Sequence, residues 1–231
     1  MTLETLKPIA ITVSTNYSDV LPFSLERNID FLDHWYIITD DNDNLTIDII
    51  KKFNSDKITL LFYKFRYIWY NSHARQNEER FFDKGGAIAM AQKIAYITFP
   101  DNWYLVLDTD VLVRRREDLD TSKLDPNKIY GPSFRYDYDS LKNFRIGKEF
   151  SIRRMVREEN PIIGFFQLYK KKKLYIPGVN TSEVDYRFTY RWHPTNRELL
   201  NITVDHLGHW GPGVNCTHNG RVLGNGFSLD T

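Results

Sequence analysis

The chain has 231 residues, with 31 Lys and Arg against 30 Asp and Glu, and 15% of its residues are aromatic. This length suits one domain with a continuous core, so we expect a single domain over residues 1–231. A net charge of +1 without a basic tail excludes a dedicated nucleic-acid-binding protein. The single Cys216 excludes an internal disulfide framework. No apolar run is long enough to cross a bilayer, so we expect a cytoplasmic protein without a transmembrane segment.

The first half of the chain alternates short strand patterns with helical patterns. Apolar, β-branched runs predict strands at four places, 8–13, 35–39, 58–63 and 103–107. Apolar residues at helical spacing predict helices over 21–29 and from Gly85 to about Pro100. This alternation predicts an α/β fold, with a mixed, mainly parallel sheet flanked by helices.

The second half has weaker patterns. Residues 114–160 are polar and aromatic without clear periodicity, and we expect a strand at 164–169 and a helix from Ser182. The glycine-rich tail, including Asp205 to Gly211, is interpreted as loop. No linker separates the two halves, which is the reason for expecting one domain.

Two acids follow the most apolar strand of the sequence. Asp108 and Asp110 come directly after Trp103 to Leu107. In an extended segment, residues i and i+2 point to the same side, so both carboxylates would face the crevice at the strand's carboxyl end. Two oxygen donors there suit Mn²⁺ or Mg²⁺, which would bridge to phosphate oxygens. A pair of solvated loop acids is the alternative.

The order of these features resembles the GT-A family of nucleotide-sugar-dependent glycosyltransferases, whose signature is a hydrophobic strand ending in D-x-D, here L-V-L-D-T-D. The resemblance covers most of the chain and implies a single GT-A-like (Rossmann-like) domain. Residues 1–113 would form the nucleotide-sugar-binding half and residues 114–231 the acceptor-binding half. The implied reaction moves a sugar from a UDP-linked donor to a glycan or other hydroxyl acceptor, with Mn²⁺ or Mg²⁺ as cofactor.

The resemblance also implies donor contacts from several loops. The segment Val13 to Asn16 is similar to the loop after the first strand that lies along the nucleoside in this family. The two acids after the second strand correspond to an acid that the family places near the base or the ribose. D-K-G at 83–85 is similar to the element that opens the helix before the D-x-D strand. The expected donor-binding residues are Thr15, Asn16, Asp40, Asp41, Arg66, Lys84, Asp108, Thr109 and Asp110.

The position of Lys84 at a helix start also favours a binding role on physical grounds. A cation at a helix start is unfavourable against the helix dipole, whereas a diphosphate is attracted to free helix N–H groups and positive charge. Lys84 is therefore a candidate for binding the donor diphosphate, and a solvated surface lysine is the alternative. Arg66 and Arg80 are further cation candidates.

Glu183 and Asp185 are the candidates for the general base of an inverting reaction. Asp185 is preferred because it matches the E-x-D spacing of the family. The sequence around these acids also matches the first turn of a helix with a capping box. In that position the helix dipole stabilises the acids whether or not they catalyse.

His206 is the expected third metal ligand, beside Asp108 and Asp110, because many GT-A enzymes complete the site with a histidine near the C-terminus. It ranks above His209 because it precedes Leu-Gly. The glycine-rich stretch with His218, Asn219 and Arg221 would fold over the diphosphate as a lid.

Aromatic and amide residues are candidates for the acceptor pocket, because sugars bind to aromatic faces and amide groups. We consider Gln167, Trp192 and the segment Tyr130 to Tyr138, although such residues also build cores.

Two other functions compete with glycosyl transfer. In a phosphotransferase of the haloacid-dehalogenase type, Asp108 would be the nucleophile and Asp110 the acid. That motif falls in the first strand, however, and no G-D or D-D pair follows Asp110 to complete its magnesium site. The second alternative is a non-catalytic carbohydrate-binding domain whose acids hold a structural cation.

Overall fold

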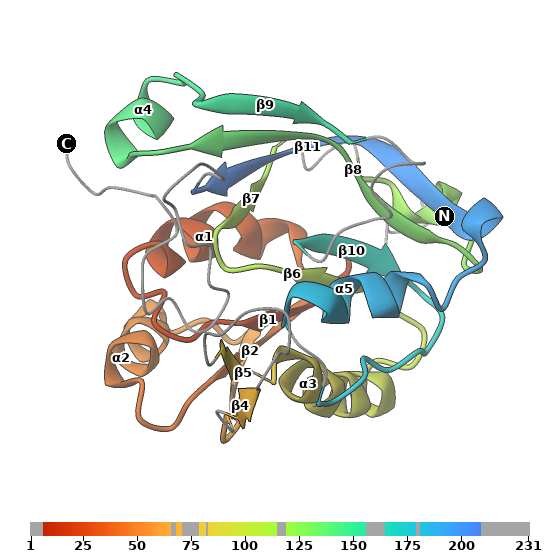
Figure 1. Ribbon diagram of the computed structural model, residues 1–231, viewed down its shortest axis with the longest axis horizontal. Helices are drawn as coiled ribbons and strands as arrows, with labels where there is room; N and C mark the ends of the chain where they lie inside the picture. The colour runs from red at the N-terminus through yellow and green to blue at the C-terminus, as the bar shows by residue number, and fades with distance from the viewer. Residues whose placement is uncertain are drawn as a thin grey trace.

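The computed structural model describes seven stretches of the chain: 7–65, 68–70, 79–81, 83–114, 119–155, 165–178 and 181–208. For 68–70, 79–81 and 181–183 only the backbone is described. The main feature is a nine-stranded mixed sheet with helices on both faces (Figure 1). The predicted α/β class with a mixed, helix-flanked sheet is therefore confirmed.

Four parallel strands form one half of the sheet, in the order β3-β2-β1-β6. All four coincide with predicted strands: β1 (Ile9–Val13), β2 (His34–Thr39), β3 (Ile58–Phe62) and β6 (Tyr104–Leu107). Their short apolar runs are typical of strands that are covered by helices on both faces.

The other half of the sheet is mostly antiparallel, so the prediction of a mainly parallel sheet holds only for the first half. It contains β10 (Phe166–Tyr169), β8 (Ile129–Tyr138), β11 (Arg197–Leu207), β7 (Val111–Val113) and β9 (Ser151–Arg154). β10 pairs antiparallel with β6 and β8, whereas β8 and β11 pair in parallel. β9 and β7 pair antiparallel with β8 and β11.

The sheet curls. β7 starts only a few residues after β6 stops, yet it pairs with β11 at the far end of the strand order, so the far end of the sheet has to bend back toward β6. Figure 1 shows β7 running from the end of β6 toward β11. The curl brings the end of β11 next to the residues that follow β6.

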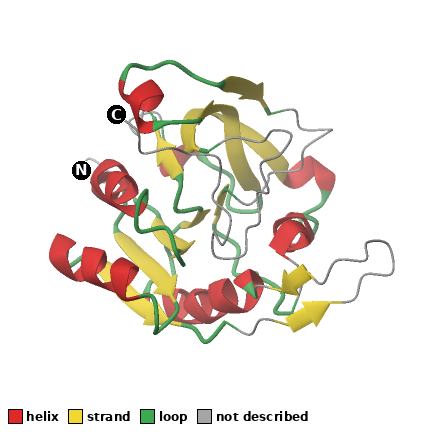
Figure 2. Cartoon of the chain, turned by 60° about the vertical axis from the view of Figure 1, so that its left-hand side comes forward, coloured by secondary structure: helices red, strands yellow, loops and turns green. Residues whose placement is uncertain are grey.

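Helices lie on both faces of the sheet (Figure 2). On one face, α1 (Leu21–Asn28) and α2 (Asn44–Phe53) pack on a core that includes Leu105 and Leu107. On the other, α3 (Lys84–Thr98) and α5 (Thr181–Thr189) pack on a core that includes Ile9 and Val106. The predicted helices α1, α3 and α5 are confirmed, and α2 was not predicted.

The remaining elements are short. They are α4 (Leu141–Arg145), the 3₁₀ turns η1 (Ile29–Phe31), η3 (Thr121–Lys123) and η4 (Pro194–Asn196), and a separate antiparallel pair, β4 (Ile68–Tyr70) and β5 (Glu79–Phe81). Across the described ranges, no helix has both the length and the apolar character that a membrane span requires.

Two segments that were interpreted as irregular are strands. β8 lies within 114–160, and β11 contains Asp205 and His206, which we had expected in a loop. Both strands carry charged residues that are buried, including Arg135, Asp137 and Asp205. Buried charges break the usual apolar alternation of a strand, and this is why the pattern was missed.

Candidate functional site

The carboxyl ends of β1 and β6 meet at the point where the strand order reverses. From β1 the chain adds β2 and β3 on one side, and β6 then pairs on the other side of β1. Open α/β sheets bind ligands at such reversals. The buried Thr109 hydroxyl joins the two strand ends, because it donates a hydrogen bond to the Val13 carbonyl over 3.1 Å. The candidate site is therefore built around the residues that follow β6.

Asp108 to Val111 form a turn, closed by a 3.2 Å hydrogen bond from the Val111 N–H to the Asp108 carbonyl. The expectation of an extended segment is therefore wrong, and the rule that i and i+2 share a side does not apply. The turn is needed because β7 has to leave β6 at once to reach β11. As a consequence, the carboxylates of Asp108 and Asp110 contact different partners.

Lys84 links two of the predicted site acids. Its Nζ lies 2.8 Å from Asp108 Oδ1 and 3.4 Å from Asp185 Oδ2, and its side chain is only 9% exposed. Burial opposes the charge, but the two carboxylates outweigh it and raise the pKa of Lys84 well above its ordinary value. The alternative of a solvated surface lysine is therefore wrong. Contact between Lys84 and a diphosphate stays a prediction.

The residues on either side of Lys84 fix the start of α3. Asp83 caps the helix by accepting a 2.8 Å hydrogen bond from the Gly86 N–H. Gly85 packs against neighbouring backbone, and a Cβ there would lie 2.3 Å from the carbonyl oxygen of Ile176. The D-K-G sequence thus provides a cap, a buried cation and a close approach between segments.

Asp185 is held in place by Tyr175 and Gln167. The Tyr175 hydroxyl donates to Asp185 Oδ1 over 3.1 Å, and Gln167 Nε2 donates to the Asp185 carbonyl over 3.2 Å. The same hydroxyl also contacts Gln167 Oε1, so its one proton is shared between these two acceptor oxygens. One oxygen of Asp185 therefore faces Lys84 and the other faces Tyr175. The side chain of Glu183, the other base candidate, lies outside the described residues.

The residues considered for the acceptor pocket have core contacts instead. Gln167 is fully buried, and Trp192 packs against Tyr169 and Phe188. The segment Tyr130 to Tyr138 is β8, and the rings at both of its ends are buried. An acceptor-lining role for Gln167 and Trp192 does not fit these contacts.

His206, the third predicted metal ligand, lies near the end of β11. The strand register places it between Asp137 of β8 and Val111 of β7. Its Nε2 lies 3.6 Å from Asp110 Oδ2, and its Nδ1 lies 3.0 Å from Asp137 Oδ1. One imidazole therefore sits between two carboxylates, one on each side.

Asp137 is a site residue that the sequence analysis missed. Its side chain is fully buried and contacts Arg135, Arg153 and Ser151 as well as His206. Burial would raise the pKa of Asp137, but the hydrogen bond and charge of His206 and the charge of Arg135 lower it to about 2. Asp137 therefore contacts the imidazole at Nδ1, on the side away from Asp110.

Asp110 and His206 are two of the three predicted metal ligands, and the structure places them next to each other. Carboxylate oxygen and imidazole nitrogen both bind Mn²⁺, and two ligands about 2.1 Å from one ion lie about 3.0–3.4 Å apart. The observed 3.6 Å is close to this spacing. Asp108 is paired with Lys84 instead, and the described residues contain no group of three or more His, Cys, Asp or Glu arranged to hold a metal ion. The structure therefore brings Asp110 and His206 together without Asp108, and metal binding by these residues stays a prediction.

The loop after β1 is held by Asp43 rather than by Asp40 or Asp41. Asn16 has a left-handed backbone with φ of 60°, and its N–H donates to Asp43 Oδ2 over 2.7 Å. Asp43 also caps α2. Asp40 and Asp41 accept hydrogen bonds from Asn42 in an exposed turn. Their contact with a nucleotide stays a prediction.

Replacing Asp43 with alanine should lower the free energy of unfolding by about 2 kcal/mol, because it removes a helix cap and the hydrogen bond to Asn16. Asp41→Ala is the matched control, and we expect a change of at most about 0.5 kcal/mol at this exposed acid. Urea denaturation measures both. Equal losses in the two variants would contradict the role given to Asp43.

Several predicted residues lie outside the described side chains. These are Arg66, Arg80, His209, His218, Asn219 and Arg221. Thr15 is described and buried, and its hydroxyl makes no hydrogen bond within the described part of the chain. Its contact with a nucleoside stays a prediction.

The candidate site thus consists of two groups of side chains joined by one turn. Lys84 connects Asp108 to Asp185, and His206 connects Asp110 to Asp137. Both groups lie beyond the carboxyl end of β6, at the reversal of strand order. The chain matches no model of a known protein family and no curated protein.

Proposed function

We propose that the protein is a metal-dependent glycosyltransferase, which moves a sugar from a UDP-linked donor to a hydroxyl group of a glycan or similar acceptor. The observation that carries the proposal is the position of the Asp108–Asp110 turn. It lies at the reversal of strand order, with Lys84 and Asp185 against one acid and His206 against the other. Such reversals are where α/β sheets bind nucleotides.

Asp110 and His206 would hold the cation, and Asp137 would fix the imidazole that faces it. A bound divalent cation supplies Lewis-acid stabilisation of the charge that develops on a departing diphosphate. Asp108 has one oxygen paired with Lys84, which leaves its second oxygen as the further candidate ligand. The Asp108–Asp110 turn would therefore contact both the cation and the buried Lys84.

Asp185 would receive the proton of the acceptor hydroxyl. In that step the acceptor oxygen bonds to the anomeric carbon, the bond from this carbon to the diphosphate breaks, and its electron pair leaves with the diphosphate. Contacts to Lys84 and Tyr175 orient the carboxylate beforehand. Unchanged turnover in both Asp185→Asn and Glu183→Gln would instead favour a retaining mechanism without this base.

Donor binding with and without metal tests the proposal. With Mn²⁺, we expect one member of a UDP-sugar panel to stabilise the protein, by about 2.7 kcal/mol at a hundred times its Kd. EDTA should abolish this stabilisation and the turnover, and Mn²⁺ should restore them. Asp110→Asn should lose both, whereas Asp48→Asn, at an exposed acid on α2, should keep both.

Two outcomes would oppose the proposal in different ways. Full activity in EDTA would refute the metal assignment. Glycan binding that survives Asp110→Asn, in a protein that neither hydrolyses nor transfers any donor, would identify a carbohydrate-binding domain.

A further inference from the structure

A pocket lies on the opposite face of the β8–β11 pair from His206. Its volume is about 540 Å³, within the range of about 300–1,000 Å³ that is typical of small-molecule sites. Successive residues of a strand point to opposite faces. Tyr138 and Asp205 line this pocket, whereas their neighbours Asp137 and His206 contact each other on the other side. The pocket is therefore separate from the candidate active site.

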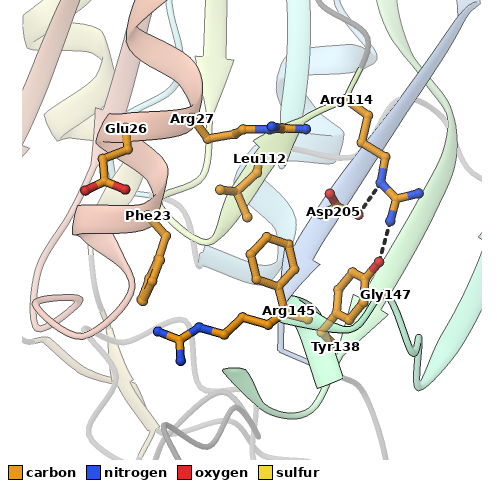
Figure 3. A pocket seen from close by; sticks show the side chains of 10 residues that line it. Phe23, Glu26, Arg27, Leu112, Arg114, Tyr138, Arg145, Gly147 and Asp205 are labelled. Atoms are coloured by element: carbon orange, nitrogen blue, oxygen red, sulfur yellow. Dashed lines mark hydrogen bonds and ion pairs between the residues drawn. The ribbon is translucent and has the colours of Figure 1, made fainter. Parts of the chain in front are cut away.

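The floor of the pocket is buried and rigidly held. Tyr138, Leu112 and Asp205 are each at most 4% exposed. Arg114 lies beside them, with its Nε 2.6 Å from Asp205 Oδ1 and a hydrogen bond donated to the Tyr138 hydroxyl (Figure 3). The same guanidinium stacks 4.4 Å from the centre of the Tyr136 ring. One acid of the pocket is thus already paired with one arginine.

Two further arginines extend over the pocket from different elements. Arg27 comes from α1 and Arg145 from α4 (Figure 3). Neither guanidinium forms a hydrogen bond or an ion pair with any residue that the structure describes. The remaining acid is Glu26, on the exposed side of α1. The pocket therefore keeps an excess of positive charge, carried by side chains that are available to a ligand.

Aromatic rings form the rest of the lining. Phe23 belongs to α1 and Phe144 to α4, and both are half-buried. The Phe144 ring packs edge-on against Tyr138, with 5.2 Å between the ring centres. A flat ring of a ligand can pack on such faces, whereas guanidinium groups bind the paired oxygens of phosphate and carboxylate.

We propose that this pocket binds a small organic anion, in which a ring carries a phosphate or a carboxylate group. Arg27 and Arg145 bind the anionic group, and Phe23 and Phe144 contact the ring. The volume of the pocket, its buried floor and the two available arginines each fit this ligand class. The proposal does not depend on glycosyl transfer.

Titration of the full chain with four probes, followed by NMR or calorimetry in EDTA, tests the proposal. Phenyl phosphate and benzoate carry both a ring and an anion, inorganic phosphate carries the anion alone, and benzyl alcohol carries the ring alone. We expect saturable binding of at least one of the first two, about tenfold tighter than either partial probe. The preference between phenyl phosphate and benzoate identifies the anionic group.

Arginine variants locate the binding site. Arg27→Gln and Arg145→Gln should each weaken binding of the preferred probe about tenfold, because each removes charged hydrogen bonds. Arg154→Gln, at an exposed arginine on β9 away from the pocket, should leave binding unchanged. Absence of saturable binding, or binding that survives both pocket variants, would overturn the proposal.

Discussion

Replacing Lys84 with methionine should lower the free energy of unfolding by about 3 kcal/mol. The substitution leaves two carboxylates, Asp108 and Asp185, without the cation that now lies 2.8 and 3.4 Å from them. Breaking a buried ion pair by removing one partner costs about 3–5 kcal/mol. We expect the lower end, because the Asp108 side chain is 24% exposed and water can solvate it in part.

The matched control is Lys93→Met, at an exposed position on the same helix, for which we expect a change of at most about 0.5 kcal/mol. Adding Asp185→Asn to Lys84→Met should recover part of the loss, because it removes one of the two unpaired charges. Urea denaturation at neutral pH measures all three variants. A loss below about 1 kcal/mol for Lys84→Met, with no recovery in the double variant, would show that the lysine does not stabilise these acids.

The four parallel strands, α1 and α3 could be predicted because the strands are mainly apolar and the two helices have apolar residues at regular spacing. The site residues Lys84 and Asp108 came from motifs beside those elements, and the structure places them in contact. Asp185 joins them across 101 residues of sequence, and no local pattern encodes that contact. Only the family resemblance predicted that Asp185 belongs to the site.

In the second half, β10 and α5 could be predicted, whereas β8 and β11 could not, because these two strands bury charge. In β8, Arg135 and Asp137 are 6% and 0% exposed, and they are stabilised by each other and by His206 of β11. The sequence of one strand does not show which other strand it pairs with. The one local signal is the i, i+2 spacing of opposite charges in F-R-Y-D-Y, which places both side chains on one face of a strand.

Replacing Asp137 with asparagine should destabilise the protein by about 3 kcal/mol and weaken Mn²⁺ binding by about 10- to 100-fold. Asparagine keeps the volume and one acceptor oxygen, so the loss comes from the charge. Arg135 would remain as a buried cation without its partner, whereas Arg153 is 45% exposed and water can solvate it. The weaker metal binding follows from a less firmly oriented His206.

The pH dependence of stability, measured in EDTA, separates the charge effect from a packing effect. The folded state lowers the pKa of Asp137 from 3.8 to about 2. The stabilisation is therefore present above about pH 4 and is lost as the pH falls toward 2, so the difference between wild type and variant should shrink over this range. Asp48→Asn, at an exposed acid, should follow the wild type throughout. If Asp137→Asn is equally destabilised at pH 7 and pH 3, its loss is one of packing, and the buried Asp137 carboxylate does not hold His206 through its charge.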